Sequence, residues 1–163
     1  MSVLIVIPAR YASTRYPAKP LAMLKGASGQ SRSLIERSWL AACEVGGVDR
    51  VVVATDDVRI KDAAEAFGAE VVMTPESCAN GTERCAAAHD VLGGGYDIVV
   101  NLQGDAPLTP HWFVEDLIAD LMTDPNAEIA TPVLRCDGAT LKSFLTDRKA
   151  DRVGGTTSVF DTN

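Results

Sequence analysis

Long apolar runs are missing from the sequence, and no stretch approaches the roughly 20 residues that a membrane-spanning helix needs. The first residues also lack the cationic start and long apolar core of a secretory signal, because Pro8 interrupts the opening run of apolar side chains. These two absences argue against membrane-spanning and secreted classes of protein. We therefore expect a cytoplasmic protein with no membrane partner.

Cysteine and histidine are also sparse. The four cysteines are scattered and form no Cys-x-x-Cys pair: Cys43, Cys78, Cys85 and Cys136. We expect reduced thiols rather than disulfides. The two histidines, His89 and His111, are too few and too far apart in the sequence to indicate a zinc site.

Charge is plentiful but unevenly distributed. The 163 residues carry a formal net charge of −7, with 47% hydrophobic and 23% charged side chains, which is typical of one globular domain, here spanning residues 1–163. Residues 1–37 nevertheless hold six cations and a single anion, Glu36. A local basic excess inside an acidic protein favours a focused anion pocket and argues against a nucleic-acid surface.

Apolar runs and amphipathic stretches alternate along the chain. Residues 3–7 form a run of five apolar side chains, typical of a strand buried on both faces, which Pro8 is expected to end. Further strands are predicted over residues 50–55, 70–73, 97–102 and 129–134. Helices are predicted over residues 34–45, 60–67, 82–92, 110–122 and 139–145. This order predicts an α/β fold with a parallel sheet.

Three details of this assignment are less regular. Thr109 is expected to cap the helix whose first residue is Pro110. Residues 25–32 are polar and contain glycine, and we expect a flexible connection there. Residues 153–160 are expected to form a poorly patterned extended segment.

Three polar loops are expected to leave the carboxyl ends of the parallel strands, over residues 8–19, 74–84 and 103–107. Such loops can converge on one crevice in an open α/β sheet. The first loop carries Arg10, Arg15 and Lys19 among prolines and small residues. We interpret it as a polyphosphate site, the alternative being a solvated basic turn.

The other two loops offer a carboxylate and a helix start. Asp105 follows a predicted buried strand, where it would suit a Mg²⁺ ligand assisted by substrate phosphates or serve as a turn residue. The helix start at residues 80–84 would bind a base or a phosphate through its backbone N–H groups, or be a plain cap. Arg84 would reach the ligand or pair with a carboxylate. The cations, the helix start and the carboxylate after a strand together suit phosphoryl or nucleotidyl transfer.

Five motifs resemble those of the 3-deoxy-D-manno-octulosonate (KDO) cytidylyltransferases. They are residues 7–15 (Ile-Pro-Ala-Arg-Tyr-Ala-Ser-Thr-Arg), 19–21 (Lys-Pro-Leu), 53–57 (Val-Ala-Thr-Asp-Asp), 81–84 (Gly-Thr-Glu-Arg) and 101–105 (Asn-Leu-Gln-Gly-Asp). The resemblance extends in register over nearly the whole chain. It implies a three-layer α/β fold of the nucleotide-diphospho-sugar transferase type, with a mostly parallel mixed sheet, and a homodimer at full length.

The resemblance also implies a reaction and its residues. CTP and KDO would give CMP-KDO and pyrophosphate, for lipopolysaccharide biosynthesis, with Mg²⁺ as the cofactor. The nucleotide-binding residues would be Pro8, Ala9, Arg10, Ser13, Arg15, Lys19, Gly81, Thr82 and Arg84. Arg10 and Lys19 would contact the CTP phosphates, Gln103 would face the sugar acid, and Asp105 would ligate Mg²⁺. Arg10, Lys19 and Asp105 would therefore be the catalytic residues.

The chain departs from the family pattern in three places and in length. Ala106 stands where an acidic residue is usual, Asn80 where serine is usual, and Tyr16-Pro17-Ala18 where Leu-Pro-Gly is usual. Family members are longer by roughly half, so we expect a chain incomplete at its C-terminus, without the second metal carboxylate and most of the KDO pocket. The alternatives are a sialic-acid or other sugar nucleotidyltransferase, and an inactive CTP-binding fragment.

Overall fold

The computed structural model describes residues 1–12, 16–152 and 158 of the chain, which divides into two compact units. The first unit is Met1–Glu128 and the second is Ile129–Asn163. We predicted a single domain over residues 1–163. The second unit is separate because its helix, α5 (Gly138–Lys149), contributes no buried residue to a core.

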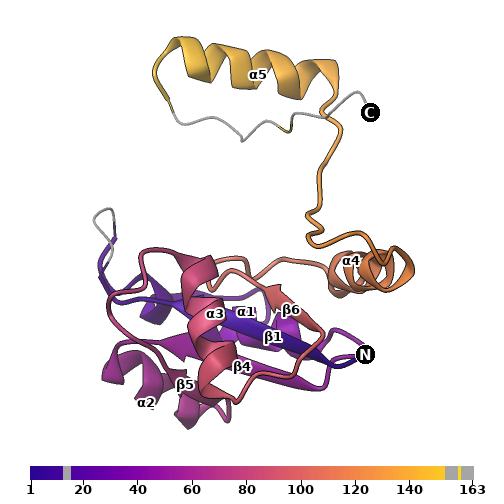
Figure 1. Ribbon diagram of the computed structural model, residues 1–163. Helices are drawn as coiled ribbons and strands as arrows, with labels where there is room; N and C mark the ends of the chain where they lie inside the picture. The colour runs from indigo at the N-terminus through magenta and orange to yellow at the C-terminus, as the bar shows by residue number, and fades with distance from the viewer. Residues whose placement is uncertain (13–15, 153–157, 159–163) are drawn as a thin grey trace. The chain divides into compact units, whose positions relative to one another are not determined.

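The first unit is built on a four-stranded parallel sheet with the strand order β5-β4-β1-β6 (Figure 1). The strands are β1 (Val3–Ala9), β4 (Arg50–Thr55), β5 (Glu70–Met73) and β6 (Ile98–Asn101). β1 pairs with both β4 and β6, in registers that place Leu4 opposite Arg50 and Val3 opposite Ile98. The predicted α/β fold with a mostly parallel sheet is confirmed.

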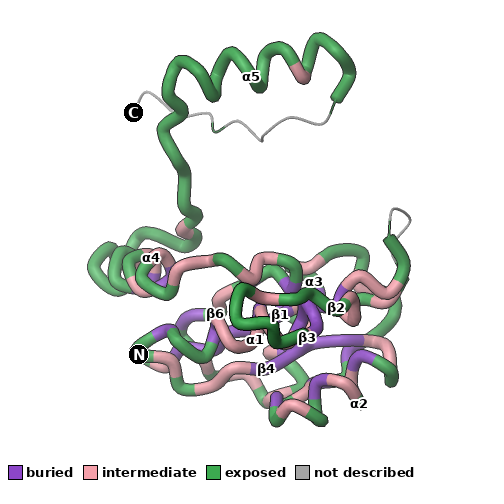
Figure 2. The backbone as a smooth tube through the Cα atoms, turned by 180° about the vertical axis from the view of Figure 1, so that it is seen from behind, coloured by how far each residue is buried: buried purple, intermediate pink, exposed green. Residues whose placement is uncertain are grey.

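Helices cover both faces of this sheet. They are α1 (Leu34–Cys43), α2 (Val58–Ala66), α3 (Gly81–Val91) and α4 (His111–Thr123). Ile5 and the other odd-numbered side chains of β1 pack with α1, α2 and α4, whereas Leu4 and Val6 pack with α3. Both faces of β1 are therefore buried, as its unbroken apolar run predicts. Figure 2 shows the buried residues concentrated on the strands and on the inner sides of the helices.

β1 runs two residues further than we predicted, because it includes Pro8 and Ala9. Pairing with β6 ends at Asn101, opposite Val6, while pairing with β4 continues to Ala9. Residue 8 therefore lies beyond the part of β1 that pairs with β6. Proline has no N–H to donate, but no hydrogen bond to β6 is needed at this position, so the strand tolerates Pro8.

The region that we predicted as a flexible connection contains a small antiparallel hairpin. Its strands are β2 (Met23–Lys25) and β3 (Ser31–Ser33), with Lys25 opposite Ser31. The Gly26 amide donates to the Gln30 carbonyl at 2.9 Å, and Gly29 adopts a φ of +82° in the turn. Three-residue strands that are mostly exposed carry no alternation of apolar and polar side chains, so the sequence gives no signal for them.

The start of α4 also differs from the prediction. Pro110 is the N-cap and the helix starts at His111. The Thr109 hydroxyl donates to the Ala106 carbonyl at 3.0 Å instead of capping the helix. That bond closes the turn after the 103–105 loop, and Pro110, which has no side-chain acceptor, stands at the N-cap.

In the second unit, residues 129–134 form no strand, contrary to our prediction. Ile129 and Leu134 are exposed, and none of the described strands pairs with this segment. α5 is longer than the predicted helix at both ends, and the Asp137 carboxylate caps its start by accepting the Thr140 amide at 2.7 Å. The extended segment predicted over residues 153–160 lies outside the described residues, apart from Ser158.

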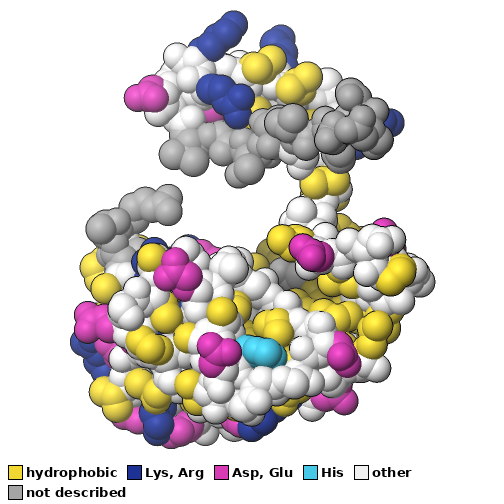
Figure 3. All heavy atoms as spheres, in the orientation of Figure 1, with side chains coloured by type: hydrophobic (Ala, Val, Ile, Leu, Met, Phe, Trp, Pro, Cys, Tyr) yellow, Lys and Arg dark blue, Asp and Glu magenta, His cyan; other side chains and the backbone are white. Residues whose placement is uncertain are grey.

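Among the described helices, none combines the length and the apolar character needed to cross a membrane. On the face drawn in Figure 3, acidic and basic side chains are scattered among hydrophobic ones.

Ile5→Ala tests whether β1 is the centre of the core. Ile5 is 0% exposed, so its truncation leaves a cavity in a close-packed interior and should lower the free energy of unfolding by about 3 kcal/mol. Leu108→Ala is the matched control, because Leu108 is 90% exposed and its truncation should cost less than about 0.5 kcal/mol. Urea unfolding followed by circular dichroism measures both variants. Equal losses would contradict the central place of β1.

Candidate functional site

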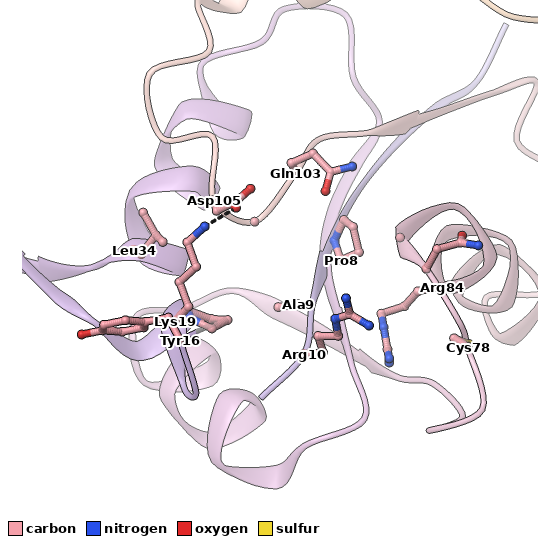
Figure 4. Close-up of a pocket in the computed structure, with 14 residues that line it drawn as sticks. Pro8, Ala9, Arg10, Tyr16, Lys19, Leu34, Cys78, Arg84, Gln103 and Asp105 are labelled. Carbon is pink, nitrogen blue, oxygen red and sulfur yellow. Dashed lines mark hydrogen bonds and ion pairs between the residues drawn. The ribbon is translucent and has the colours of Figure 1, made fainter. Parts of the chain in front are cut away.

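A cavity of about 600 Å³ opens at the carboxyl ends of the strands, between the loops that follow β1, β5 and β6. Eight of the residues singled out from the sequence line it together (Figure 4): Pro8, Ala9, Arg10, Lys19, Gly81, Arg84, Gln103 and Asp105. Thr82 does not line it, and Ser13 and Arg15 lie outside the described residues. The three loops expected to converge therefore do so.

Lys19 is held at the cavity by a tight turn, the 3₁₀ helix η1 (Lys19–Leu21). The preceding residue, Ala18, has a φ of 56°, a left-handed conformation that costs a residue with a side chain about 1–2 kcal/mol. The Ala18 amide donates to the Tyr11 carbonyl at 3.0 Å, and the Ala18 carbonyl accepts from the Leu21 amide at 2.9 Å. These bonds on both sides of Ala18 fix the backbone from which Lys19 projects.

A cation–π contact braces the same loop from α2. The Arg59 guanidinium lies 3.3 Å from the centroid of the Tyr11 ring. Arg59 also donates to Asp57 through Nε, at 2.9 Å, and this hydrogen bond holds the pKa of the Asp57 carboxyl below its ordinary value. Asp57 caps α2 and does not line the cavity, so its charge serves the scaffold.

Lys19 and Asp105 form an ion pair inside the cavity. The Lys19 Nζ donates to Asp105 Oδ2 at 2.5 Å, the dashed line in Figure 4. Their side chains are 45% and 48% exposed, so water screens the attraction and the pair contributes little to stability. Both groups are therefore able to change partners at low cost when a ligand enters.

Asp105 is positioned by a close backbone contact behind it. A Cβ on Gly104 would lie 2.8 Å from the Pro8 carbonyl oxygen and 3.2 Å from Ile35 Cδ1, so the loop can rest on the end of β1 only with glycine there. The buried Ser38 hydroxyl of α1 donates to the Gly104 carbonyl at 3.0 Å. The contact and the hydrogen bond together fix the position of Asp105 relative to the sheet.

The first turn of α3 forms another wall of the cavity. Asn80 is its N-cap, because Asn80 Oδ1 accepts the Glu83 amide at 2.9 Å while Glu83 Oε2 accepts the Ala79 amide at 2.8 Å. The Asn80 side chain therefore caps the helix, and the Glu83 carboxylate satisfies the amide of the residue before the cap. A Cβ on Gly81 would lie 3.3 Å from Pro8 Cγ, so the helix start packs closely on the end of β1.

Arg84 is buried, with only 3% of its side chain exposed. Its Nη2 donates to Asp56 Oδ2 at 2.8 Å and its Nη1 donates to Thr74 Oγ1 at 2.6 Å. Of the two roles left open by the sequence, pairing with a carboxylate is the one observed. Figure 4 shows Arg84 and Cys78 on the side of the cavity away from Lys19, with Pro8, Ala9 and Arg10 between them.

The cysteine next to Arg84 is not a nucleophile. Burial raises the pKa of the Cys85 thiol to about 12, and the Arg84 charge opposes this only in part. The thiol is therefore protonated at neutral pH, whereas nucleophilic chemistry needs a thiolate.

The donor set fits Mg²⁺ only together with a phosphate ligand. Asp105 is the sole carboxylate among the described lining residues, and the described part of the chain holds no cluster of three His, Cys, Asp or Glu side chains. Mg²⁺ commonly takes one or two carboxylates and completes its shell with phosphate oxygens and water. Asp105 beside a polyphosphate meets that requirement.

Several lining residues had no role assigned from the sequence: Tyr16, Pro20, Leu34, Cys78, Asn80 and Gly104. Pro20, Asn80 and Gly104 lie inside or beside the motifs, and that proximity is the signal that could have found them. Leu34 and Cys78 have no local signal, because their place at the cavity depends on how α1 and the loop after β5 pack.

Comparison with known proteins identifies the family. Residues 4–150 match the family model described as cytidylyltransferase. The chain belongs to this family. A 3-deoxy-manno-octulosonate cytidylyltransferase of Maricaulis maris is 50% identical over 161 residues, which are 99% of this chain and 60% of the relative. A mitochondrial 3-deoxy-manno-octulosonate cytidylyltransferase of Arabidopsis thaliana is 44% identical over 128 residues, 78% of this chain and 42% of the relative.

A solved structure extends this similarity to the fold. It is CMP:2-keto-3-deoxy-manno-octonic acid synthetase complexed with CTP, with a TM-score of 0.70 and 38% identity over 77% of this chain and 49% of that one. The resemblance to the KDO cytidylyltransferases and the fold type that it implied are thereby confirmed. This cytidylyltransferase chain spans 60% or less of the length of the three proteins compared.

Gly104→Ala tests how the chain positions Asp105. The new Cβ would meet the Pro8 carbonyl, a backbone atom that cannot swing aside, so the loop must shift, and the free energy of unfolding should fall by about 1–3 kcal/mol. Gly138→Ala is the control, because open space surrounds Gly138 and its φ is not positive. Thermal unfolding compares the two variants. A Gly104→Ala variant as stable as the wild type would contradict the close contact.

Proposed function

We propose that this cytidylyltransferase chain is the CTP-binding part of a Mg²⁺-dependent KDO cytidylyltransferase, which forms CMP-KDO and pyrophosphate. The observation that carries the proposal is that Arg10 and Lys19, from the loop after β1, line one cavity with Asp105, from the distant loop after β6. The names of the relatives with 50% and 44% identity support the choice of KDO as the second substrate.

The proposed chemistry is an in-line displacement at phosphorus. The anomeric hydroxyl of KDO attacks the α-phosphorus of CTP, the new P–O bond forms, the bond to pyrophosphate breaks, and the hydroxyl proton is lost to solvent or a base. Arg10 and Lys19 would orient the triphosphate and compensate its charge as it shifts to the leaving group. Pro8 and Ala9 would offer backbone groups to cytosine, and Gln103 would face the sugar acid.

When bound, Mg²⁺ would withdraw charge from the phosphate oxygens and so favour departure of pyrophosphate. Asp105 is the residue that would hold it. In the structure Lys19 is paired with Asp105. Binding of CTP with Mg²⁺ would therefore give both residues new partners. Lys19 would turn to a phosphate oxygen while the carboxylate accepts the metal.

The proposal extends to pathway, location and assembly, and the resemblance implies all three, the location being expected from the composition as well. The product would serve lipopolysaccharide biosynthesis, the reaction would take place in the cytoplasm, and the longer protein would be a homodimer. The competing functions are a sialic-acid or other sugar nucleotidyltransferase and a CTP-binding module without activity. The second of these is favoured if the 163-residue chain binds CTP and shows no turnover.

Calorimetric titration of the 163-residue chain tests the proposal. We expect saturable but weak binding of CTP with Mg²⁺, weaker binding of ATP, and slow pyrophosphate release that depends on KDO. A panel of sugar acids separates the alternatives, because a sialic-acid enzyme would release pyrophosphate faster with sialic acid than with KDO. Failure of CTP to bind with Mg²⁺ present would contradict the proposed function.

Asp105→Asn should change CTP affinity in opposite directions with and without metal. Without Mg²⁺ the variant should bind CTP about threefold more tightly, because Lys19 is released and a repelling carboxylate is removed. With Mg²⁺ it should bind CTP more weakly than the wild type, because the metal loses its protein ligand. Asp120→Asn, on the exposed side of α4, is the charge-matched control. The same sign of change in both conditions would remove Asp105 from the metal role.

A further inference from the structure

One guanidinium joins three segments of the first unit near the cavity. Asp56 follows β4, Thr74 follows β5, and Arg84 lies in the first turn of α3. The Arg84 guanidinium donates to Asp56 Oδ2 at 2.8 Å and to Thr74 Oγ1 at 2.6 Å. A backbone bond from the Thr74 amide to the Thr55 carbonyl, at 2.9 Å, ties the two strand ends to each other.

This junction of Arg84, Asp56 and Thr74 lies in the interior of the first unit. Arg84 is 3% exposed, Asp56 is 16% exposed, and Thr74 is buried. A guanidinium removed from water must regain its hydrogen bonds inside the protein, so each lost acceptor leaves an unpaired donor beside a fixed positive charge. The hydroxyl of Thr74 and the carboxylate of Asp56 are thus both needed to hold Arg84 in one place.

The held segment is a wall of the cavity. Asn80, Gly81 and Arg84 line it, and Gly81 packs against the ring of Pro8. The Asn80 side chain satisfies the Glu83 amide, and the Arg84 amide donates to the Asn80 carbonyl at 3.2 Å. Within the described residues, the amides of Gly81 and Thr82 have no acceptor, as is usual for the first turn of a helix.

We infer that Asp56 and Thr74, which do not themselves line the cavity, are positioning residues for the nucleotide: through Arg84 they hold the first turn of α3 at the cavity. The inference rests on the proposed function, because it assigns these residues to the CTP site. It also gives Arg84 a different task from Arg10 and Lys19. Arg84 acts on the ligand through the backbone that it holds, and its charge is already matched by Asp56.

Thr74→Val is the sharpest test, because it removes the hydroxyl acceptor and changes neither charge nor, to a close approximation, volume. We expect exchange of the Glu83 and Arg84 amides, measured by NMR in the ligand-free chain, to become about tenfold faster. CTP affinity with Mg²⁺ should fall about tenfold, since small displacements of binding groups are costly. Thr74→Ser keeps the hydroxyl and should restore both values. Thr123→Val, at the exposed end of α4, is the matched control.

Asp56→Asn separates positioning from direct contact. If Arg84 contacted the phosphates itself, removing its neutralising partner would strengthen CTP binding. Positioning predicts weaker binding, with an effect less than additive with that of Thr74→Val, because both substitutions act on one guanidinium. Stronger CTP binding by Asp56→Asn would overturn the inference.

CTP binding by the wild type distinguishes failure of the inference from failure of the proposed function. If wild type binds CTP and Thr74→Val leaves the affinity unchanged, the inference is overturned whatever the exchange rates show. If wild type does not bind CTP, the proposed function is overturned, and with it the assignment of Asp56 and Thr74 to a CTP site. Faster exchange in Thr74→Val alone would then show a junction that serves stability only.

Discussion

The structure depends on the parallel pairing of β1 with a strand on each side. Because β4, β1 and β6 run in the same direction, the loops that follow them leave at one edge of the sheet. Lys19 and Asp105 are 86 positions apart in the sequence, yet they meet there as an ion pair. The meeting requires the loop after β6 to lie directly on the end of β1, and the missing side chain of Gly104 permits this. Burial of β1 on both faces holds the arrangement in place.

Two ion pairs at the cavity have opposite physical characters. Arg84 and Asp56 are buried, and the hydrogen bond to Thr74 adds a neutral acceptor, so separating them would leave a desolvated charge. Lys19 and Asp105 are about half exposed, and water compensates each of them when they separate. The first pair therefore suits a fixed wall, and the second suits groups that exchange partners with a ligand. Arginine and lysine are placed according to this division, since a guanidinium donates several hydrogen bonds in a fixed geometry and an ammonium group on a flexible stem moves easily.

The sequence predicted those parts of the fold that leave a periodic or compositional signal. The runs at residues 50–55 and 70–73 are the observed β4 and β5, and the helix predicted from residue 34 begins there as α1. The β2–β3 hairpin was not predicted, because its short, exposed strands have no apolar face. Residues 129–134 have a strand-like composition, but no described strand pairs with them. A strand needs a neighbouring strand, and composition does not show whether there is one. At the site, the converging loops were predictable from strand order, whereas the partner of Arg84 was not, because it depends on side-chain packing between β4, β5 and α3.

The charges of the cavity give a physical reason for the metal dependence that we propose. Three cations line it in the described part of the chain, namely Arg10, Lys19 and Arg84, and two of them already face a carboxylate. A triphosphate arriving without a metal would meet positive charge that is largely compensated, and it would be repelled by Asp105. Asp105 would hold a divalent cation, whose charge would compensate that of the carboxylate, and Lys19 would then be free for the phosphates. An acidic protein can thus hold a polyanion with few basic residues, provided that the metal and the nucleotide enter together.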